Sequence, residues 1–490
     1  MSGIRLRFPP SPTGRIHIGN MRTALFNWLW ARKNEGELVL RIEDTDLGRS
    51  TREFEDIILK EMKWLGLDVD EGVGHSGDYG PYRQSERIDI YQKYAEKILE
   101  EGKAYYCYCS PEEIDEMRKE ATNKGGMPRY NGRCRTLTEE EKERYEEEGR
   151  KPVIRYRLSD EDREIVVDDM IRGKVSFNSS VLDDFIIYKS DGMPTYNFAV
   201  VIDDALMEIT EVIRGEDHLS NTPKQILIYE ALGFDIPRFA HLPLILDENK
   251  AKLKKRSDSD AVYIGEYREK GYLPEVLFNF LSLLGWSTKD EQEIMSREEI
   301  ISRFDIADVN KSAAVFDVEK LNWMNGKYIR ETDLDKIVKM SIPYLKEAGY
   351  ITGEISDEKY EWLQRVVEVA RNSISYLSQI PEEAGLFFKE LEFEDKEKAI
   401  EEFQGEDVEL VFTTLKEKLA ELEDFNPDAI NKIFNKMRKK LPVKARTIYH
   451  PSRVALTGMN SGPELNHVIY ILGIEETERR LDSALSLAGK

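Results

Sequence analysis

A proline-rich turn near the N-terminus places His17 and Gly19 where they could bind phosphate. Residues 4–8 alternate like a half-buried strand, and apolar residues recur at helical spacing from Ile18 onward. The first turn of a helix presents unpaired N–H groups, Gly19 lets a ligand approach the backbone, and His17 can donate a hydrogen bond. The stretch therefore predicts either a phosphate site or a turn that is purely structural.

The three cysteines of the chain, Cys107, Cys109 and Cys134, fall in one short window. Two thiolates one residue apart, with a third after a loop that contains glycine and proline, supply three of the four ligands of a tetrahedral zinc site. Tyr130 could supply the fourth ligand as a phenolate. The pattern indicates a structural zinc site, and three ordinary reduced cysteines are the alternative.

A cationic run at residues 250–256 carries Lys252, Lys255 and Arg256. Lysines on a loop can close over a triphosphate and neutralise charge that develops only in the transition state. A solvated basic turn is the alternative. The sequence holds neither Gly-x-x-x-x-Gly-Lys-Ser/Thr nor Gly-x-Gly-x-x-Gly, which argues against P-loop NTPases and dinucleotide enzymes.

Further polar groups stand at the ends of predicted strands. Glu43 follows strand 37–42, a strand over residues 194–204 carries Tyr196 and ends in two acids, and strand 209–213 ends at Arg214. A further strand is predicted over residues 239–246. Open α/β sheets bind ligands at the carboxyl ends of their strands. Arg214 suits the carboxylate of a substrate, and a structural pair with an aspartate is the alternative.

The elements that position these groups indicate several domains, because 490 residues are too many for one core. The first half alternates strands and helices. From residue 260 onward the pattern is amphipathic helices, which we expect to break at the prolines Pro343, Pro381, Pro427, Pro442 and Pro463. We expect no transmembrane helix and no signal peptide, and the few cysteines favour the cytoplasm.

The charge is strongly uneven along the chain. A net charge of −23 argues against non-specific binding of nucleic acid by the whole surface. Residues 429–463 nevertheless contain no Asp or Glu and eight Lys or Arg. This window suits contact with nucleic-acid phosphates, and a solvated helix face is the alternative.

Residues 9–20 and 252–256 resemble the two signatures of class I aminoacyl-tRNA synthetases, usually written HIGH and KMSKS. The blocks at residues 41–46, 80–85, 194–196, 212–218 and 321–330 are similar to those of bacterial glutamyl-tRNA synthetases, in the same order and over nearly the whole chain. The chain is thereby identified as a member of that family. A non-catalytic RNA-binding module would need neither signature.

The resemblance implies an α/β catalytic domain with a doubly wound, Rossmann-like parallel sheet, an inserted α+β acceptor-binding domain and all-α anticodon-binding domains. We expect the catalytic domain at residues 1–106 and 185–244 and the insertion at 107–184. A stem-contact region with the lysine loop would span 245–325, and helical domains would span 326–378 and 379–490. The runner-up, glutaminyl-tRNA synthetase, carries β-barrels where the C-terminal third here is predicted to be helical.

The resemblance also implies an activity: ATP-dependent joining of L-glutamate to AMP, with Mg²⁺, and its transfer to tRNA(Glu) by a monomer that needs no membrane. Glutamate would be held by Arg7, Ser11, Glu43, Tyr196 and Arg214, with Arg214 on a substrate carboxylate and Glu43 on the α-ammonium. ATP would contact His17, Gly19, Glu216 and Lys255, and catalysis would use His17, Lys252, Lys255 and Arg256. The tRNA would contact Arg371, Ser373, Lys444 and Arg453.

Three residues depart from the pattern of the family. Asn20 replaces the last residue of HIGH, a position that the family leaves loose, and Lys254 stands where KMSKS has the serine at its third position. Ser373 stands where members that reject tRNA(Gln) carry an arginine, so an enzyme that charges both tRNA(Glu) and tRNA(Gln) is a live alternative. Cys107, Cys109, Tyr130 and Cys134 are spaced as in the zinc site of some members of the family. In other members the fourth ligand is a histidine two residues after the last cysteine, where this chain has Thr136, so Tyr130 is the better candidate for the fourth ligand.

Overall fold

The computed structural model describes residues 3–46, 48–126, 128–251, 253 and 262–490. The chain forms two compact units. The first comprises Met1–Arg268 and Pro274–Val318, and the second comprises Glu269–Leu273 and Glu319–Lys490. No helix in the described part of the chain is long and apolar enough to cross a membrane.

A parallel sheet forms the centre of the first unit. Strand β1 (Arg5–Phe8) pairs in parallel with β2 (Glu37–Leu40), which pairs in parallel with β3 (Glu71–Gly72). On its other side, β1 lies beside β9 (Glu211–Gly215), since the Thr210 N–H donates to the Arg5 carbonyl over 2.9 Å. Strand β9 pairs in parallel with β10 (Arg238–Leu242), and β10 with β6 (Glu164–Asp169). An antiparallel strand, β7 (Gly173–Asn178), completes the edge.

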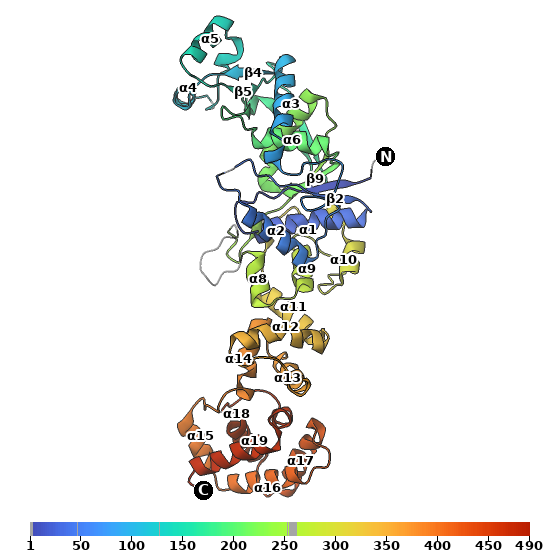
Figure 1. Cartoon of the computed structure of the whole chain (residues 1–490), viewed down its shortest axis with the longest axis vertical. Coiled ribbons are helices and arrows are strands. Elements are labelled where there is room, and N and C mark those ends of the chain that lie inside the picture. Colours follow the sequence, from blue (N-terminus) through green and yellow to red (C-terminus); the bar gives the residue numbers. More distant parts are fainter. Residues whose placement is uncertain (1–2, 47, 127, 252, 254–261) are drawn as a thin grey trace. The chain divides into compact units, whose positions relative to one another are not determined.

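Helices cover both faces of this sheet (Figure 1). One face carries α1 (Ile18–Lys33) and α2 (Arg52–Leu65), and the other carries α3 (Ile88–Glu100), α6 (Tyr196–Leu206) and α7 (Thr222–Leu232). The core of the second face joins apolar residues of α3, α6 and α7 to those of the strands. This arrangement confirms the predicted doubly wound α/β fold.

A second sheet in the first unit is antiparallel and small. It consists of β4 (Ala104–Cys107), β5 (Val153–Tyr156) and β8 (Ile186–Tyr188), in the order β4-β5-β8. Between β4 and β5 the chain forms α4 (Pro111–Asn123) and α5 (Glu139–Glu147). Both helices begin with a capping box, in which Ser110 and Thr138 accept hydrogen bonds from the backbone three residues later.

The prediction of a strand over residues 194–204 is wrong, because residues 196–206 form helix α6. A continuous apolar run rich in Val and Ile is typical of a buried strand and equally of a helix that is buried on most sides. Five consecutive residues of α6, from Phe198 to Ile202, are each no more than 1 % exposed. The apolar run therefore predicts that the segment is buried, but it cannot distinguish a strand from a helix.

Two other expectations need correction. The predicted strand 239–246 is interrupted at Pro243, so that β10 ends at Leu242 and the short β11 (Ile245–Leu246) pairs separately with β12 (Ala314–Val315). Pro343 does not break its helix, because α12 (Leu334–Glu347) continues through it. Pro343 is exposed, so the carbonyl group that loses its helical partner can be solvated.

From residue 262 onward the chain forms α8 (Ile264–Lys270), whose last two residues belong to the second unit, and then α9 (Pro274–Ser282) and α10 (Arg297–Arg303) of the first unit. The second unit is built from helices around its own apolar core, as predicted. Their bounds are α11 (Val318–Glu331), α12, α13 (Asp357–Ala370), α14 (Ile380–Ala384), α15 (Lys396–Phe403), α16 (Val408–Ala420), α17 (Pro427–Lys440), α18 (Ala445–Thr457) and α19 (Leu465–Leu487).

Candidate active site

A pocket of about 770 Å³ opens at the carboxyl ends of β1, β9 and β10. The predicted residues that line it come from both halves of the parallel sheet: Arg7, Ser11, His17, Gly19, Glu43, Tyr196 and Arg214. The structure therefore brings together all five residues predicted to hold glutamate and two of those predicted to hold ATP. Their roles stay predictions, because the pocket alone does not identify a ligand.

His17 lies at the entrance of α1 and is its N-cap residue, with φ −81° and ψ 150°. Its Nδ1 accepts a hydrogen bond from the Gly19 N–H over 3.1 Å. In a neutral imidazole, an Nδ1 that accepts leaves the proton on Nε2. The helix entrance thus fixes the tautomer that presents a ring N–H donor on Nε2.

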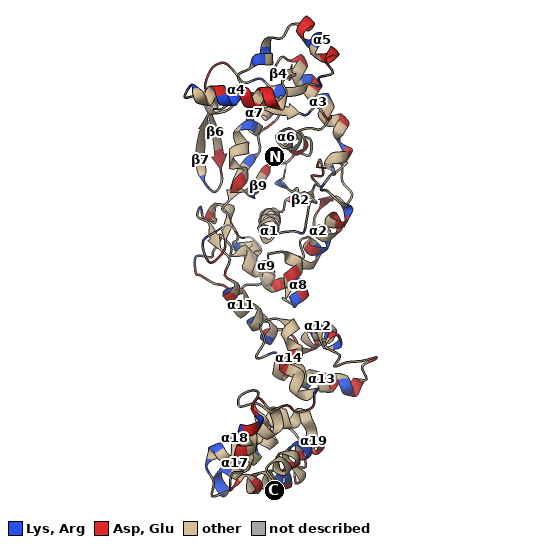
Figure 2. Cartoon of the chain, turned by 90° about the vertical axis from the view of Figure 1, so that its left-hand side faces the viewer, with Lys and Arg blue, Asp and Glu red and all other residues tan. Residues whose placement is uncertain are grey.

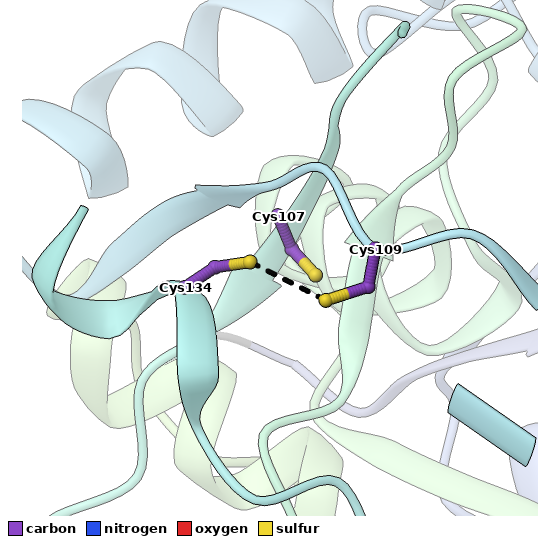
Figure 3. A group of neighbouring side chains, drawn as sticks. All are labelled: Cys107, Cys109 and Cys134. Atoms are coloured by element: carbon purple, nitrogen blue, oxygen red, sulfur yellow. Dashed lines mark hydrogen bonds between the residues drawn. The ribbon is translucent and has the colours of Figure 1, made fainter. Parts of the chain in front are cut away.

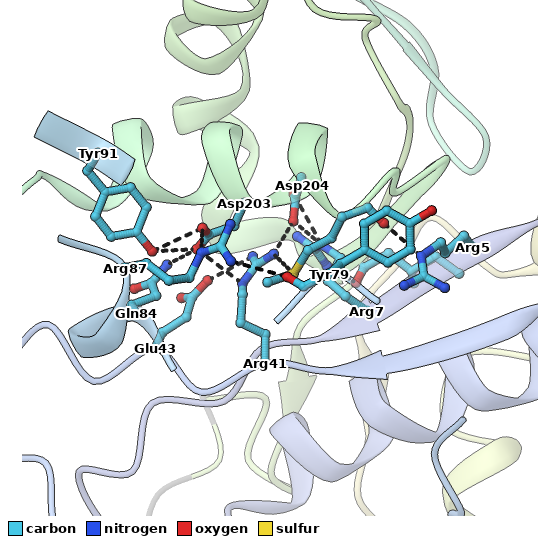
Figure 4. A network of polar contacts seen from close by, with 12 residues as sticks. Arg5, Arg7, Arg41, Glu43, Tyr79, Gln84, Arg87, Tyr91, Asp203 and Asp204 are labelled. Carbon is cyan, nitrogen blue, oxygen red and sulfur yellow. Dashed lines mark hydrogen bonds and ion pairs between the residues drawn. The ribbon is translucent and has the colours of Figure 1, made fainter. Parts of the chain in front are cut away.

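A network of buried ion pairs includes two residues that line the pocket, Arg7 and Glu43 (Figure 4). Arg7 Nε donates to both carboxylate oxygens of Asp204 over 3.2 Å, and Arg41 Nη1 donates to Asp204 over 2.7 Å. Arg41 also contacts Glu43 over 3.2 Å. Burial works to raise the pKa of Asp204, but Arg7 and Arg41 together hold that pKa below its ordinary value.

The neighbouring Asp203 completes this network. Its carboxylate accepts hydrogen bonds from Arg87 Nε over 2.7 Å, Gln84 Nε2 over 2.9 Å and the Tyr91 hydroxyl over 2.9 Å. Both aspartates project from α6 toward side chains of the sheet and of the segment before α3 (Figure 4). The network therefore fixes the helix that carries Tyr196 relative to the strands that carry Arg7 and Arg41.

Glu43 lies next to this network but is only weakly compensated. Its side chain is 8 % exposed, and burial raises the pKa of Glu43 to about 7, against the opposing effects of Arg41 and Arg7. A carboxylate in this state gains from a further cation in the pocket. Tyr196, on the other wall, places its hydroxyl 3.1 Å from His218 Nδ1.

Arg214 differs from Arg7, the buried cation on the neighbouring strand that lines the same pocket. Its Nε donates to His241 Nε2 over 3.1 Å and its Nη2 to the Thr222 hydroxyl over 2.8 Å. Its Nη1 is buried and makes no hydrogen bond with any described residue. Across the ranges that the structure describes, no carboxylate forms an ion pair with Arg214, and burial lowers the pKa of this guanidinium. The arrangement presents a buried positive charge that no described carboxylate contacts directly.

The remaining residues predicted to contact ATP or to act in catalysis do not line the pocket or are not described. Glu216 does not line the pocket: its carboxylate forms an ion pair with Arg172 and accepts a hydrogen bond from the Leu244 N–H over 2.9 Å. Lys252, Lys255 and Arg256 lie outside the described residues.

The three cysteines converge between β4 and the turn at residues 133–136 (Figure 3). Their sulfur atoms all lie within 4.8 Å of one another, and those of Cys109 and Cys134 are 3.5 Å apart. The Tyr130 hydroxyl lies 3.7 Å from the Cys107 sulfur and accepts a hydrogen bond from the Cys134 N–H over 2.7 Å. Hydrogen bonds from the other two thiols lower the pKa of Cys107. Three sulfur atoms and one phenolic oxygen are thus gathered within the size of a metal site.

The predicted tRNA residues all lie in the second unit. Arg371 follows α13 and donates to the Thr332 carbonyl over 3.1 Å, while Ser373 is exposed. Lys444 is exposed at the start of α18, and Arg453 donates to the Pro463 carbonyl over 2.6 Å. Lys and Arg gather on α17 and the start of α18 (Figure 2). The basic window of the sequence is therefore an exposed surface on these helices.

Sequence reasoning missed several residues that support the pocket. The sequence placed Asp203 and Asp204 at the edge of a site but did not indicate that they support it. Nothing in the sequence pointed to His241, because a lone histidine inside an apolar strand is typical of a core residue. Only the sheet register shows that His241 lies opposite Arg214.

Comparisons with known proteins agree along the whole chain. Residues 3–323 match the family described as tRNA synthetases class I (E and Q), catalytic domain, and residues 336–485 match an anticodon binding domain. The chain is 52 % identical over 488 residues to glutamate–tRNA ligase 2 of Caldanaerobacter subterraneus subsp. tengcongensis, covering 99 % of this chain and 100 % of that one. It is 48 % identical over 479 residues to the glutamate–tRNA ligase of Bacillus subtilis, covering 98 % and 99 %.

A solved structure gives the same result. The crystal structure of a glutamate tRNA ligase from Elizabethkingia meningosepticum in complex with its amino acid superimposes with a TM-score of 0.89 at 37 % identity, covering 99 % of each chain. Sequence and fold thus match members of one family from end to end. The chain belongs to the class I tRNA synthetases of the E and Q group, and within that group to the glutamate–tRNA ligases.

Proposed function

We infer that the chain attaches L-glutamate to tRNA(Glu) at the expense of ATP. In the first step, an oxygen of the glutamate α-carboxylate attacks the α-phosphorus of ATP, which forms glutamyl-adenylate and releases pyrophosphate. In the second, a ribose hydroxyl of the terminal nucleotide attacks the glutamyl carbonyl, and AMP leaves. The observation that carries the proposal is Arg214, a buried cation in the pocket without an ion-pair partner among the described residues.

Amino-acid recognition would rest on charges of both signs. Arg214 and Arg7 would face the carboxylates of glutamate, and Glu43 would hold its α-ammonium, with Tyr196 and Ser11 completing the pocket. Glutamine would be refused because its neutral amide leaves a buried guanidinium unpaired, which costs more than the loss of an apolar contact.

Activation of glutamate would need positioning and electrostatics and no protein nucleophile. His17 Nε2–H and the N–H groups at the start of α1 suit the phosphates of ATP. Lys252, Lys255 and Arg256 would stabilise the charge on the α-phosphate and the leaving pyrophosphate, and Glu216 would lie toward the ribose. Mg²⁺ bound with ATP would neutralise part of the phosphate charge.

The direct test is charging of purified tRNA with labelled glutamate. Wild type should charge tRNA(Glu), and Lys255→Ala should lose most ATP–pyrophosphate exchange measured with tRNA present. Lys189→Ala, a change to an exposed lysine elsewhere in the first unit, is the matched control and should keep normal exchange. Full exchange in Lys255→Ala would remove that residue from catalysis, and a wild type that charges no tRNA would refute the function.

The same assay addresses tRNA selection. In the second unit, Arg371 would mark the anticodon region, with Lys444 and Arg453 on the basic surface and Ser373 beside it. The alternative, charging of tRNA(Gln) as well, is favoured by Ser373, whose hydroxyl lacks the charge and fork of an arginine. Glutamate incorporated into tRNA(Glu) alone would exclude that alternative, and charging of both tRNAs would support it.

The thiol cluster is proposed as a structural zinc site. The three sulfur atoms within 4.8 Å of one another and the nearby Tyr130 hydroxyl fit the tetrahedral set of donors that Zn²⁺ prefers. Bound zinc would tie β4 to the loop that carries Cys134. Protein purified without chelator should contain about one zinc per chain, and Cys134→Ser should lose it. Metal-free wild-type protein would refute the site.

The boundaries of the domains and the assembly state are also proposed. The catalytic domain would comprise 1–106 and 185–244, the acceptor-binding insertion 107–184, the stem-contact region with the lysine loop 245–325, and the anticodon-binding domains 326–378 and 379–490. The chain would act as a monomer in the cytoplasm, and sedimentation of the chain with and without tRNA tests the first of these two statements.

A further inference from the structure

Three neighbouring strands bring an acid, a histidine and the glutamate-facing arginine into one line. In the parallel register, His241 on β10 lies opposite Arg214 on β9. On the other side of β10, Phe239 lies opposite Asp169, the last residue of β6. His241 is 0 % exposed and Asp169 is 2 % exposed. The line Asp169–His241–Arg214 therefore runs through the buried sheet and ends at the pocket.

The contacts along this line are short and directional. Asp169 Oδ2 accepts from the His241 backbone N–H over 3.0 Å and lies 2.6 Å from His241 Nδ1. Its Oδ1 accepts from the backbone N–H groups of Ile171 and Arg172 over 3.0 and 2.8 Å. Asp169 is thus held by its own backbone turn, and its second oxygen is aimed at the imidazole.

The chemistry of the donors fixes the proton on His241. The Arg214 Nε–H can only donate, so His241 Nε2, which it contacts over 3.1 Å, must be the accepting nitrogen. Nδ1 therefore carries the proton and donates it to Asp169. Burial lowers the pKa of His241, which keeps the ring neutral beside the guanidinium. The Thr222 hydroxyl lies 3.1 Å from the same Nε2 and accepts from Arg214 Nη2.

We propose that His241, oriented by Asp169, is a positioning residue for glutamate: it fixes the plane of the Arg214 guanidinium so that the remaining Nη1 faces the substrate. This rests on the proposed function. Two of the three nitrogens of Arg214 are held by His241 and Thr222, and the third is buried without a partner among the described residues. A guanidinium held at two nitrogens keeps one orientation, which makes its third nitrogen selective for a carboxylate oxygen.

A purely structural dyad would behave differently. Asp169 already caps its own turn through Oδ1, and this role needs no histidine. A structural role predicts that loss of His241 lowers the stability of the chain and affects all substrates alike. The positioning role predicts a selective loss of affinity for glutamate.

The experiment compares three variants of the full chain in charging of tRNA(Glu). His241→Leu removes the acceptor for Arg214 and should raise the KM for glutamate about tenfold or more, while the KM for ATP stays within about twofold. His241→Gln can place its amide oxygen near the position of Nε2 and should recover most of the affinity. Asp169→Asn should put its oxygen on the two backbone N–H groups and its NH₂ toward Nδ1, which favours the wrong tautomer of His241.

Asn279→Leu is the matched control for loss of a buried polar group. Asn279 is 0 % exposed in α9 and accepts from the Met295 N–H over 3.0 Å, away from the pocket residues. It should lower the melting temperature without changing the KM for glutamate. The preference for glutamate over glutamine should fall in His241→Leu and Asp169→Asn and not in Asn279→Leu.

The possible failures can be told apart. A wild-type chain that charges no glutamate would refute the proposed function together with this inference. If wild type charges tRNA(Glu) but His241→Leu and His241→Gln have the same KM for glutamate, the inference alone is refuted. A parallel rise of the KM values for glutamate and ATP in His241→Leu or Asp169→Asn would likewise assign the dyad a structural role.

Discussion

Arg7 and Arg214 are both buried and line the same pocket, yet their charges are balanced in different ways. Arg7 is 1 % exposed and donates to both oxygens of Asp204, which Arg41 also contacts. Arg214 is 5 % exposed and contacts a neutral histidine and a hydroxyl. The charge of Arg7, on one wall of the pocket, is therefore balanced within the protein. The charge of Arg214, on the other wall, has no carboxylate in direct contact among the described residues.

The difference follows from the cost of burying a charge. An ion that leaves water loses several kcal/mol of solvation unless a counter-ion and hydrogen bonds replace it. Asp204 provides this replacement for Arg7 within the fold, and an anionic substrate would provide it for Arg214. Arg7 therefore belongs to the scaffold of the pocket, whereas Arg214 would be a cation that meets the ligand.

Removal of the Asp204 charge should have the largest effect, on the stability of the wall that carries Arg7. Asp204→Asn leaves Arg7 and Arg41 with too little negative charge in a buried site, which should lower the free energy of unfolding by about 3–5 kcal/mol. Denaturant unfolding measures this change. If the free energy of unfolding falls by less than about 1 kcal/mol, the ion pairs of Asp204 do not stabilise this wall of the pocket.

Removal of the Arg214 charge should act on catalysis. Arg214→Gln should lower kcat/KM for glutamate about thirtyfold or more, since an unpaired partner of a buried charge pair costs about 2–5 kcal/mol. Arg214→Lys keeps the charge without the planar fork and should fall between Gln and wild type. Steady-state charging of tRNA(Glu) measures both variants. Equal kinetics of Arg214→Gln and wild type would end the comparison between the two walls.

Glu43 should make glutamate binding depend on pH. Burial raises its pKa to about 7, so the folded chain binds a proton that the unfolded chain has released above its ordinary pKa of about 4.3. The contribution of Glu43 to the free energy of unfolding therefore falls as the pH rises from about 4.3 to 7. Binding of the α-ammonium favours the ionised form, so the KM for glutamate should rise by up to about tenfold for each pH unit below 7.

The pH dependence has its own control. Glu43→Gln should raise the KM for glutamate at pH 8 and flatten its dependence between pH 6 and 8, because the titrating group is gone. A slope that persists unchanged in Glu43→Gln would assign the dependence to another residue.

The smallest effect should be that of Arg214 on stability. Arg214→Met removes a buried charge that no described carboxylate balances, and the freed Thr222 hydroxyl can donate to His241 Nε2, 3.1 Å away. The free energy of unfolding should change by no more than about 1 kcal/mol, in either direction. A loss as large as that in Asp204→Asn would place Arg214 in the scaffold as well.

The fold was predictable from the sequence where local pattern and tertiary structure agree. The strand at residues 5–8, the helix that begins at Ile18 and the helical C-terminal third follow from period, caps and prolines. The prediction failed at α6, whose apolar run is buried on nearly every side and so shows no period. The pairing of β6 with β10 depends on long-range contacts that no local pattern contains.

The candidate site divides in the same way. Residues in recognisable blocks, such as His17, Glu43 and Arg214, were predicted and lie in one pocket. Asp169 and His241 were not, because their relation to Arg214 exists only in the register of three strands that are far apart in the sequence. Motifs therefore predict the residues that meet a ligand better than those that orient them.

Among the described residues, none between Glu43 and Tyr196 lines the pocket. The intervening segment reaches the site through supporting contacts: Gln84, Arg87 and Tyr91 hold Asp203. Asp169 likewise holds His241, and Arg172 pairs with Glu216. Most of that segment, including the sheet and helices around the thiol cluster, can therefore lengthen, shrink or be exchanged during evolution while the pocket stays intact. The length of this segment is thus separated in the fold from the geometry of the pocket.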